Sequence, residues 1–260
     1  MRLLILLLLP CPCLCQAGAE IDSLKKFSYF VYGYKDRNLI EQGTGFFLQV
    51  KRKMVFATAR HLITGWDTIN NTSSGDSVNT FYLRVYDKKD SSKYFLPFNV
   101  TEARKTLKNG YAFVYPDLCV FELKGLEPYQ INAIEYKKDD YPIKRKIETG
   151  YSFGYPVTDS IDDKNNYLSL GASMTSYQML NDYSKNTVWT DLNRQDSLNY
   201  IIHGTSGRFA TGISGSPMFL KLEGSGRYLF GGMLILGDTA THDITVLRPE
   251  FIINAANSKH

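Results

Sequence analysis

Three segments of the 260-residue chain contain the residue types that together make an activated nucleophile. They are Ser214 in "TGISGSP", His61 in "ATARHLI" and Asp117 in "YPDLCVF". A hydroxyl becomes a good nucleophile when a neighbouring base takes its proton, and a third group orients that base. Nucleophilic catalysis is therefore the chemistry that these residue types could perform.

Each segment also has an ordinary structural explanation: a glycine-rich turn, an exposed or structural histidine, and an aspartate that starts a turn. The glycines near Ser214 allow a sharp turn that aims N–H groups into one space, as an oxyanion site requires. His61 closes a predicted strand, where its ring can face a cleft. Asp117 enters a strand that is apolar on both faces, where a carboxylate needs a partner. A histidine would be that partner.

The order His61, Asp117, Ser214, with separations of 56 and 97 positions, resembles the chymotrypsin-like (trypsin-fold) serine peptidases. "TARH" is similar to the family's Thr-Ala-Ala-His segment, "PDLCVFEL" to its Asp-(Ile/Leu)-Ala-Val strand, and "GISGSP" to its Gly-Asp-Ser-Gly-Gly-Pro turn. "GTGFF" resembles the Gly-Ser-Gly-Phe entry of the bacterial exported branch. The resemblance implies an all-β fold of two antiparallel six-stranded β-barrels with a C-terminal helix.

The resemblance also implies roles for the site residues. Ser214 would attack the scissile carbonyl, His61 would act as base and then acid, and Asp117 would fix the histidine tautomer. The backbone N–H groups of Gly212 and Ser214 would form the oxyanion hole. "GMLILG" resembles the strand that pairs with substrate, so the backbone of Ile235, Leu236 and Gly237 would add the substrate as a further strand.

Several departures from the family point to its bacterial-type exported branch, which includes glutamyl endopeptidases and HtrA-like enzymes. Ile213 stands where many animal members place an aspartate, and the predicted mature start, "EIDS", lacks their Ile-Val-Gly-Gly opening. Cys119 would be the one mature cysteine, so no internal disulfide is expected. Ser216 replaces the second glycine of the nucleophile turn. The chain after Leu236 is too short for an appended PDZ domain.

Arg208 lies six residues before Ser214, where the family often places the base of its primary specificity pocket. By this resemblance, a positive charge there would favour substrates with acidic side chains.

Short runs rich in β-branched and aromatic residues, bounded by Gly, Asn, Asp, Ser or Pro, predict strands. They cover residues 27–34, 45–50, 54–58, 80–86, 118–123, 218–222 and 228–236. Pro249 is suited to the first turn of a helix at about 249–257. We expect one peptidase domain over residues 20–260, with a first barrel at about 24–131 and a second at about 147–247. Residues 132–146, which are charged and contain Pro142, are the predicted connector.

Composition limits the function classes. The chain has 43% apolar and 22% charged residues, which excludes a disordered polar chain and a membrane bundle. The formal net charge of +4 comes from interspersed signs and does not indicate nucleic-acid binding. The sequence contains no HExxH or paired-cysteine motif, so we expect no metal and no cofactor. The expected partner is a peptide or protein substrate, and the expected state is a monomer.

Residues 1–19 predict a secretory signal peptide. Arg2 precedes an apolar run at residues 3–9, and small residues follow at 17–19. A seven-residue run is too short to cross a bilayer, which takes about 20 residues. We therefore expect a secreted or periplasmic protein with no integral membrane segment in the mature chain.

Three alternatives compete with a secreted serine endopeptidase. An α/β-hydrolase would need G-x-S-x-G with its acid and histidine after the serine, and Ser216 breaks that motif. A catalytically silent homologue could use the same cleft to bind peptides or a partner protein. A non-enzymatic exported β-domain would make all three motifs coincidental.

Overall fold

The computed structural model describes most of the first predicted half of the chain and about half of the second. The described residues are 20–36, 38–64, 66–67, 72–73, 78–100, 117–136, 147–155, 169–174, 178–179, 199–203, 212–222, 224, 226–238 and 243–257. The predicted leader at residues 1–19 and the predicted pocket residue Arg208 lie outside these ranges.

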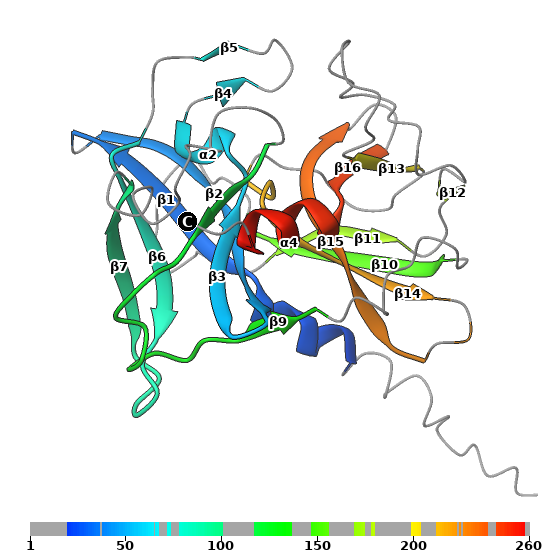
Figure 1. Cartoon of the computed structure of the whole chain (residues 1–260), viewed down its shortest axis with the longest axis horizontal. Helices are drawn as coiled ribbons and strands as arrows, with labels where there is room; N and C mark the ends of the chain where they lie inside the picture. The colour runs from blue at the N-terminus through cyan, green and yellow to red at the C-terminus, as the bar shows by residue number, and fades with distance from the viewer. Residues whose placement is uncertain are drawn as a thin grey trace, which may run out of the picture.

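The first sheet has the strand order β7-β6-β1-β2-β3-β8, and β9 pairs with β2 in parallel. The other strand pairs are antiparallel. Figure 1 shows this sheet on the left, from blue to green. Its strands are β1 (Tyr29–Lys35), β2 (Asn38–Val50), β3 (Lys53–Thr58), β6 (Thr80–Tyr86), β7 (Lys93–Asn99), β8 (Cys119–Phe121) and β9 (Ala133–Glu135).

The second sheet has the order β11-β10-β14-β15-β16-β13-β12, and its pairs are antiparallel. It occupies the right of Figure 1. Its strands are β10 (Ile147–Gly154), β11 (Ser169–Met174), β12 (Gln178–Met179), β13 (Asn199–His203), β14 (Pro217–Leu222), β15 (Tyr228–Asp238) and β16 (Asp243–Leu247). A separate pair joins β4 (Trp66–Asp67) to β5 (Thr72–Ser73).

Alternation along the strands builds the core of the first sheet. In β6, Phe81, Leu83 and Val85 are fully buried, whereas Thr80 and Tyr82 are half-buried on the opposite face. The buried set packs with apolar side chains of β1, β2, β3 and β8 in one hydrophobic cluster. The first sheet therefore has its own core on one face.

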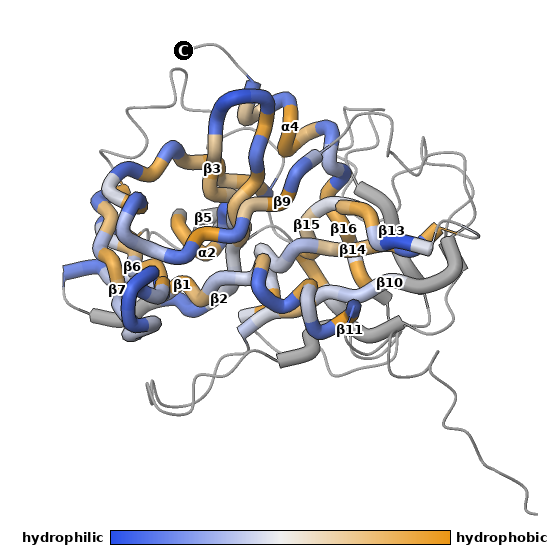
Figure 2. Tube along the Cα trace, turned by 90° about the horizontal axis from the view of Figure 1, so that it is seen from below, coloured by the Kyte–Doolittle hydropathy of each residue, from blue (hydrophilic) through white to orange (hydrophobic). Residues whose placement is uncertain are grey.

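A second hydrophobic cluster joins the two sheets. It includes Phe46 and Val120 from the first sheet, Phe219 and Met233 from the second, and Ile252 from the C-terminal helix. That helix, α4 (Pro249–Asn257), packs against β15, β2 and β8. Figure 2 shows apolar residues along strands of both sheets and in α4. This shared core fixes the position of one sheet relative to the other.

The prediction of an all-β fold with two antiparallel sheets and a C-terminal helix is confirmed, with Pro249 at the first helical position. Within the described ranges, seven strands pair in each sheet where six were predicted. The additional pairings include β9 and β12, which are three and two residues long and too short for a periodic pattern. β9 lies within the predicted connector at 132–146, of which residues 137–146 are outside the described ranges.

Candidate active site

His61 and Asp117 contact each other at two points. The backbone N–H of His61 donates to Asp117 Oδ1 at 2.9 Å, and His61 Nδ1 lies 2.7 Å from Asp117 Oδ2. The carboxylate side chain is only 4% exposed, whereas the imidazole is 25% exposed. Because Asp117 holds Nδ1, the opposite ring nitrogen, Nε2, points away from the carboxylate. Such a ring can accept a proton at Nε2 while Asp117 stabilises the resulting cation.

Two neighbouring strands position this pair. β3 ends at Thr58, and β8 begins at Cys119, which pairs with Thr58. The sequence predicted that His61 closes the strand, but the structure places it three residues after the end of β3. His61 instead begins the short helix α2 (His61–Thr64). The backbone leaves the extended conformation here because Ile63 N–H turns back to the Arg60 carbonyl at 2.9 Å. The turn brings the backbone N–H of His61 to the Asp117 carboxylate.

Ser214 lies in a tight turn before β14. Gly212 and Gly215, on either side, have φ angles of +97° and +87°, a region that glycine enters without strain. Ser216 closes the turn by donating both its N–H and its hydroxyl to the Ile213 carbonyl. Since the two ends of a trans peptide point in opposite directions, the N–H of Ser214 faces away from the interior of the turn.

The turn is also attached to β15. Gly215 N–H donates to the Leu234 carbonyl at 2.8 Å, and Leu234 N–H donates to the Ser216 carbonyl at 2.9 Å. The Ser214 hydroxyl donates to the Ile235 carbonyl at 3.2 Å. This carbonyl is available because the pairing of β15 with β16 is irregular between Leu234 and Leu236. The serine is therefore positioned by the same strand that was predicted to bind substrate.

The predicted substrate strand has one edge that extends beyond β14. β14 pairs with β15 only as far as Met233, and the nucleophile turn engages Leu234. Leu236 and Gly237 pair with β16 on the other edge. Among the described residues, no strand pairs with Leu236 and Gly237 on the edge that faces away from β16. An extended peptide could hydrogen-bond there as an added strand.

Thr44 of β2 connects the nucleophile turn to the first sheet, and the sequence did not predict this role. Its N–H donates to the Ser214 carbonyl at 3.2 Å, and its hydroxyl donates to the Gly212 carbonyl at 2.9 Å. The same hydroxyl accepts the N–H of Tyr155, at the end of β10, at 2.9 Å. Thr44 is fully buried. One side chain therefore holds both the nucleophile turn and the second sheet.

The turn packs tightly against this part of the first sheet. A Cβ atom on Gly215 would lie 2.0 Å from the Thr44 carbonyl oxygen and 2.9 Å from the Thr58 hydroxyl. That hydroxyl donates to the Thr44 carbonyl at 2.7 Å. Thr58 is three residues before His61, so the serine turn docks on the strand end that leads to the histidine. Gly215 of "GISGSP" is the sequence signal for this close approach.

Tyr155 brings a buried charge close to the same junction. Its ring contacts the Phe30 ring, with centroids 5.5 Å apart, and the Arg84 guanidinium lies 4.5 Å from its centroid. Burial raises the pKa of the Tyr155 hydroxyl, and the neighbouring Arg84 cation opposes this rise. The phenol is therefore neutral near pH 7 and has a structural role at the contact between the sheets.

Two solved structures with the same architecture are proteases. The chain matches the active form of the Rv3671c protease from M. tuberculosis with a TM-score of 0.52 and 14% identity, over 98% of this chain and 90% of that one. It matches the thermostable serine protease AL20 from an extremophilic microorganism with a TM-score of 0.52 and 11% identity, over 91% and 99% of the two chains. The chain has the trypsin-like protease fold. No protein-family model matches it, and no curated protein matches its sequence.

Within this trypsin-like fold, the candidate residues come from both sheets. His61 and Asp117 lie beside strands of the first sheet, and Ser214 precedes β14 of the second. Across the part of the chain that the structure describes, no group of three or more His, Cys, Asp or Glu side chains could hold a metal ion. None of the helices in those described ranges is both long enough and apolar enough to span a membrane.

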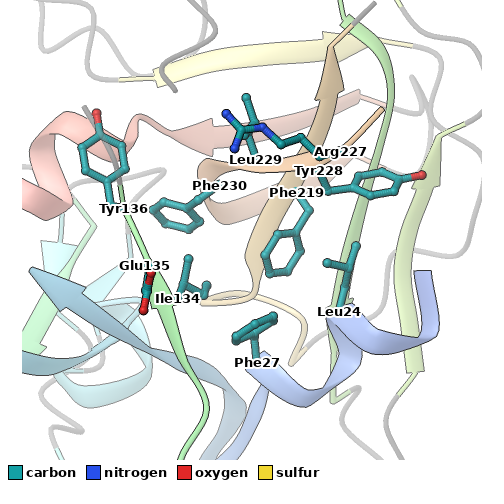
Figure 3. A pocket seen from close by; sticks show the side chains of 10 residues that line it. All are labelled: Leu24, Phe27, Ile134, Glu135, Tyr136, Phe219, Arg227, Tyr228, Leu229 and Phe230. Carbon is teal, nitrogen blue, oxygen red and sulfur yellow. The ribbon is translucent and has the colours of Figure 1, made fainter. Parts of the chain in front are cut away.

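A pocket of about 240 Å³ lies at another junction of the trypsin-like fold, where the 3-10 helix η1 (Lys25–Phe27) and β9 meet the β14–β15 hairpin. Figure 3 shows aromatic rings gathered in this pocket and an arginine at its rim. None of the three candidate catalytic residues lines it. Its lining is Leu24, Phe27, Ile134, Glu135, Tyr136, Phe219, Arg227, Tyr228, Leu229 and Phe230.

Proposed function

We propose that this chain is a serine endopeptidase of the bacterial-type exported branch, with His61, Asp117 and Ser214 as its catalytic triad. The observation that carries the proposal is the two-point contact between His61 and Asp117, which leaves Nε2 of the ring pointing away. The nucleophile turn docks on the strand end that precedes this histidine. The fold is shared with the Rv3671c protease and the serine protease AL20, which supports the same activity.

In the first half of the reaction, Ser214 Oγ bonds to the scissile carbonyl carbon, and its proton passes to His61 Nε2. For this step the hydroxyl turns from the Ile235 carbonyl, its partner in the structure, toward the imidazole. The developing oxyanion would accept hydrogen bonds from the N–H groups of Gly212 and Ser214. The carbon–nitrogen bond then breaks, the His61 proton goes to the leaving amine, and an acyl-enzyme remains.

In the second half, His61 takes a proton from water, and the hydroxide attacks the acyl carbon. The proton returns to Ser214 Oγ as the ester bond breaks, which releases the carboxylic acid. Asp117 orients the imidazole and stabilises the imidazolium in both halves. The substrate backbone would lie along Ile235, Leu236 and Gly237, on the edge of β15 beyond β14.

A fluorophosphonate probe tests the proposal directly. It reacts with an activated serine, and peptide mapping by mass spectrometry locates the adduct. We expect labelling at Ser214, none in the Ser214→Ala variant, and strongly slowed labelling in His61→Ala. A folded protein that is not labelled, and that cleaves no peptide in a proteome-derived library, would refute the proposal.

A catalytically silent homologue is the second candidate. The observation that favours it is the hydrogen bond from the Ser214 hydroxyl to the Ile235 carbonyl, which occupies the proton that His61 would accept. Such a protein would bind peptides along β15 without cleaving them. It would leave Ser214 unlabelled and return a bound peptide intact.

The remaining parts of the proposal concern specificity and location. A preference for acidic side chains at the cleavage site, set by Arg208, is tested by comparing Glu, Asp, Leu and Lys substrates with Arg208→Ala. Export is tested by N-terminal sequencing of the protein from the medium or periplasm of a producing host. We expect a start just after Ala17 or Ala19. Light scattering after gel filtration should give the mass of one chain.

A further inference from the structure

Three tyrosines form a corner on the face of the first sheet that also carries Thr44. Tyr32 of β1 lies opposite Tyr82 of β6, and their rings stack with centroids 5.1 Å apart and planes inclined by 15°. The Tyr34 ring meets both at steep angles, 69° to Tyr32 and 76° to Tyr82. All three side chains are half-buried. The faces of these rings carry negative electrostatic potential.

A carboxylate completes this corner. Asp36 follows β1 with a φ of +49° and is exposed, and Asn79 donates to its Oδ1 at 3.1 Å. These side chains surround a pocket with a volume of about 560 Å³, which we call the tyrosine pocket. Its lining is Tyr32, Tyr34, Asp36, Asn79, Thr80 and Tyr82.

One cation of the chain already lies over aromatic rings on this face of the sheet. Arg84, two residues after Tyr82 on the same face of β6, places its guanidinium 5.3 Å from the Phe30 centroid and 4.5 Å from the Tyr155 centroid. Cations are attracted to ring faces at such distances, and more strongly where water is excluded. The tyrosine pocket offers three other aromatic rings together with the negative charge of Asp36, and it opens to solvent.

The tyrosine pocket is close to the candidate active site. Phe30 lies opposite Thr44, whose N–H donates to the Ser214 carbonyl, and Tyr32 lies opposite Gln42. Two residues along a strand span roughly 7 Å, and an extended peptide rises about 3.3 Å per residue. A peptide that crosses Ser214 could therefore place a side chain about three to five residues from the scissile bond into the tyrosine pocket.

We infer that the tyrosine pocket is a subsite for a basic side chain, lysine or arginine, of the bound polypeptide. The stacked rings would contact the aliphatic stem and the cationic head, and Asp36 would pair with the charge. This inference rests on the proposed function for the path of the peptide, but the binding itself does not require cleavage.

Binding to the Ser214→Ala chain tests the inference without turnover. Fluorescence anisotropy would compare two fluorescein-labelled peptides, (Gly-Lys-Ser)₄ and (Gly-norleucine-Ser)₄. We expect the lysine peptide to bind at least five-fold more tightly. In the Ser214→Ala background, Asp36→Asn and Tyr82→Ala should each remove most of that difference. Asp90→Asn and Tyr94→Ala are matched controls, because both residues are exposed near or in β7 of the same sheet, outside the pocket.

Equal affinities for the two peptides would overturn the inference, as would equal losses in the control variants. Displacement of the lysine peptide by cellohexaose would also overturn it, because the pocket would then be a carbohydrate site. Failure of the proposed function has a different signature: the peptide preference persists, but Ser214 of the unmodified chain is not labelled. Asp36→Asn changes an exposed side chain, so its result does not depend on the folding of Tyr82→Ala.

Discussion

Replacement of Thr44 by valine tests the bridge between the two sheets. Valine has nearly the shape of threonine but no hydroxyl. In Thr44→Val the Gly212 carbonyl loses its 2.9 Å donor, and the Tyr155 N–H loses its 2.9 Å acceptor. Both groups are in a fully buried setting, because the Thr44 side chain that faces them has no exposed surface.

The magnitude follows from these two groups. A buried polar group left without a partner costs about 1–3 kcal/mol, so the loss of partners for both groups should lower the free energy of unfolding by about 2–6 kcal/mol. Thr44→Ser keeps the hydroxyl and removes one methyl group, which costs about 1 kcal/mol. The isosteric variant should therefore be the less stable of the two. Hydrophobic packing alone predicts the opposite order.

Activity should follow the same order. Thr44 holds the carbonyls of Gly212 and Ser214, so without its hydroxyl the nucleophile turn can adopt other conformations. Once such conformations predominate, each further shift of about 1.4 kcal/mol in their favour leaves about ten-fold fewer competent molecules. We expect kcat/KM of Thr44→Val to fall at least about ten-fold, whereas Thr44→Ser should stay within about three-fold of the unmodified chain.

Urea denaturation followed by circular dichroism measures the stability, and the rate of fluorophosphonate labelling measures the competence of the turn. Labelling is carried out well below the unfolding midpoint, so that a lower stability does not itself lower the rate. A Thr44→Val protein within about 0.5 kcal/mol of the unmodified chain, with normal labelling, would refute the role assigned to the hydroxyl.

Other perturbations test separate contacts. Gly215→Ala and Gly224→Ala both place a side chain at positive φ, which costs about 1–2 kcal/mol of stability in each variant, but only the Gly215 side chain would meet the Thr44 carbonyl. Urea denaturation should therefore show a loss of stability that is about 1–3 kcal/mol larger for Gly215→Ala, and equal losses in the two variants would contradict the docking. Asp117→Asn should fold and lose about 10³–10⁴-fold in kcat, which steady-state kinetics would show, and an active variant would rule out its role. The pH profile of kcat/KM should rise between about pH 6 and 8 as His61 loses its proton, and a maximum near pH 4 would exclude this mechanism. Burial raises the pKa of Tyr29 from 10.0 to about 12, so between pH 10 and 12 the folded chain keeps a proton that the unfolded chain loses. The free energy of unfolding should therefore fall by about 1.4 kcal/mol per pH unit in this range. Urea midpoints of Tyr29→Phe, measured over the same range, should lack this part of the pH dependence.

Strands with one buried face could be predicted from the sequence. β6 matches its predicted range of 80–86, because its buried and half-buried residues alternate at the start of a run rich in β-branched and aromatic residues. β7 escaped prediction for the opposite reason. It is an edge strand with mostly exposed or half-buried residues, and it contains Pro97, which only an edge tolerates without losing a ladder hydrogen bond.

In the candidate site, too, some contacts could be predicted from the sequence and others could not. The pairing of His61 with Asp117 could be predicted, because a carboxylate before a buried strand requires a partner and the family resemblance supplied one. Thr44 could not be found in this way. Its hydroxyl joins Gly212 and Tyr155, which are 168 and 111 positions away in the sequence, and no local pattern encodes contacts of that range.

The separation of these contacts in sequence also explains why small residues surround the site. The nucleophile turn comes from the second sheet and must approach the backbone of β2 closely enough for Thr44 N–H to reach the Ser214 carbonyl. A side chain at Gly215 would occupy that space. The absence of a side chain at Gly215 thus allows the nucleophile turn to lie close to β2. The hydrogen bonds of the Thr44 hydroxyl then hold the turn in that position. A chain with the three candidate catalytic residues but a larger residue at position 215 would still contain the catalytic residue types, but its nucleophile turn could not dock against β2.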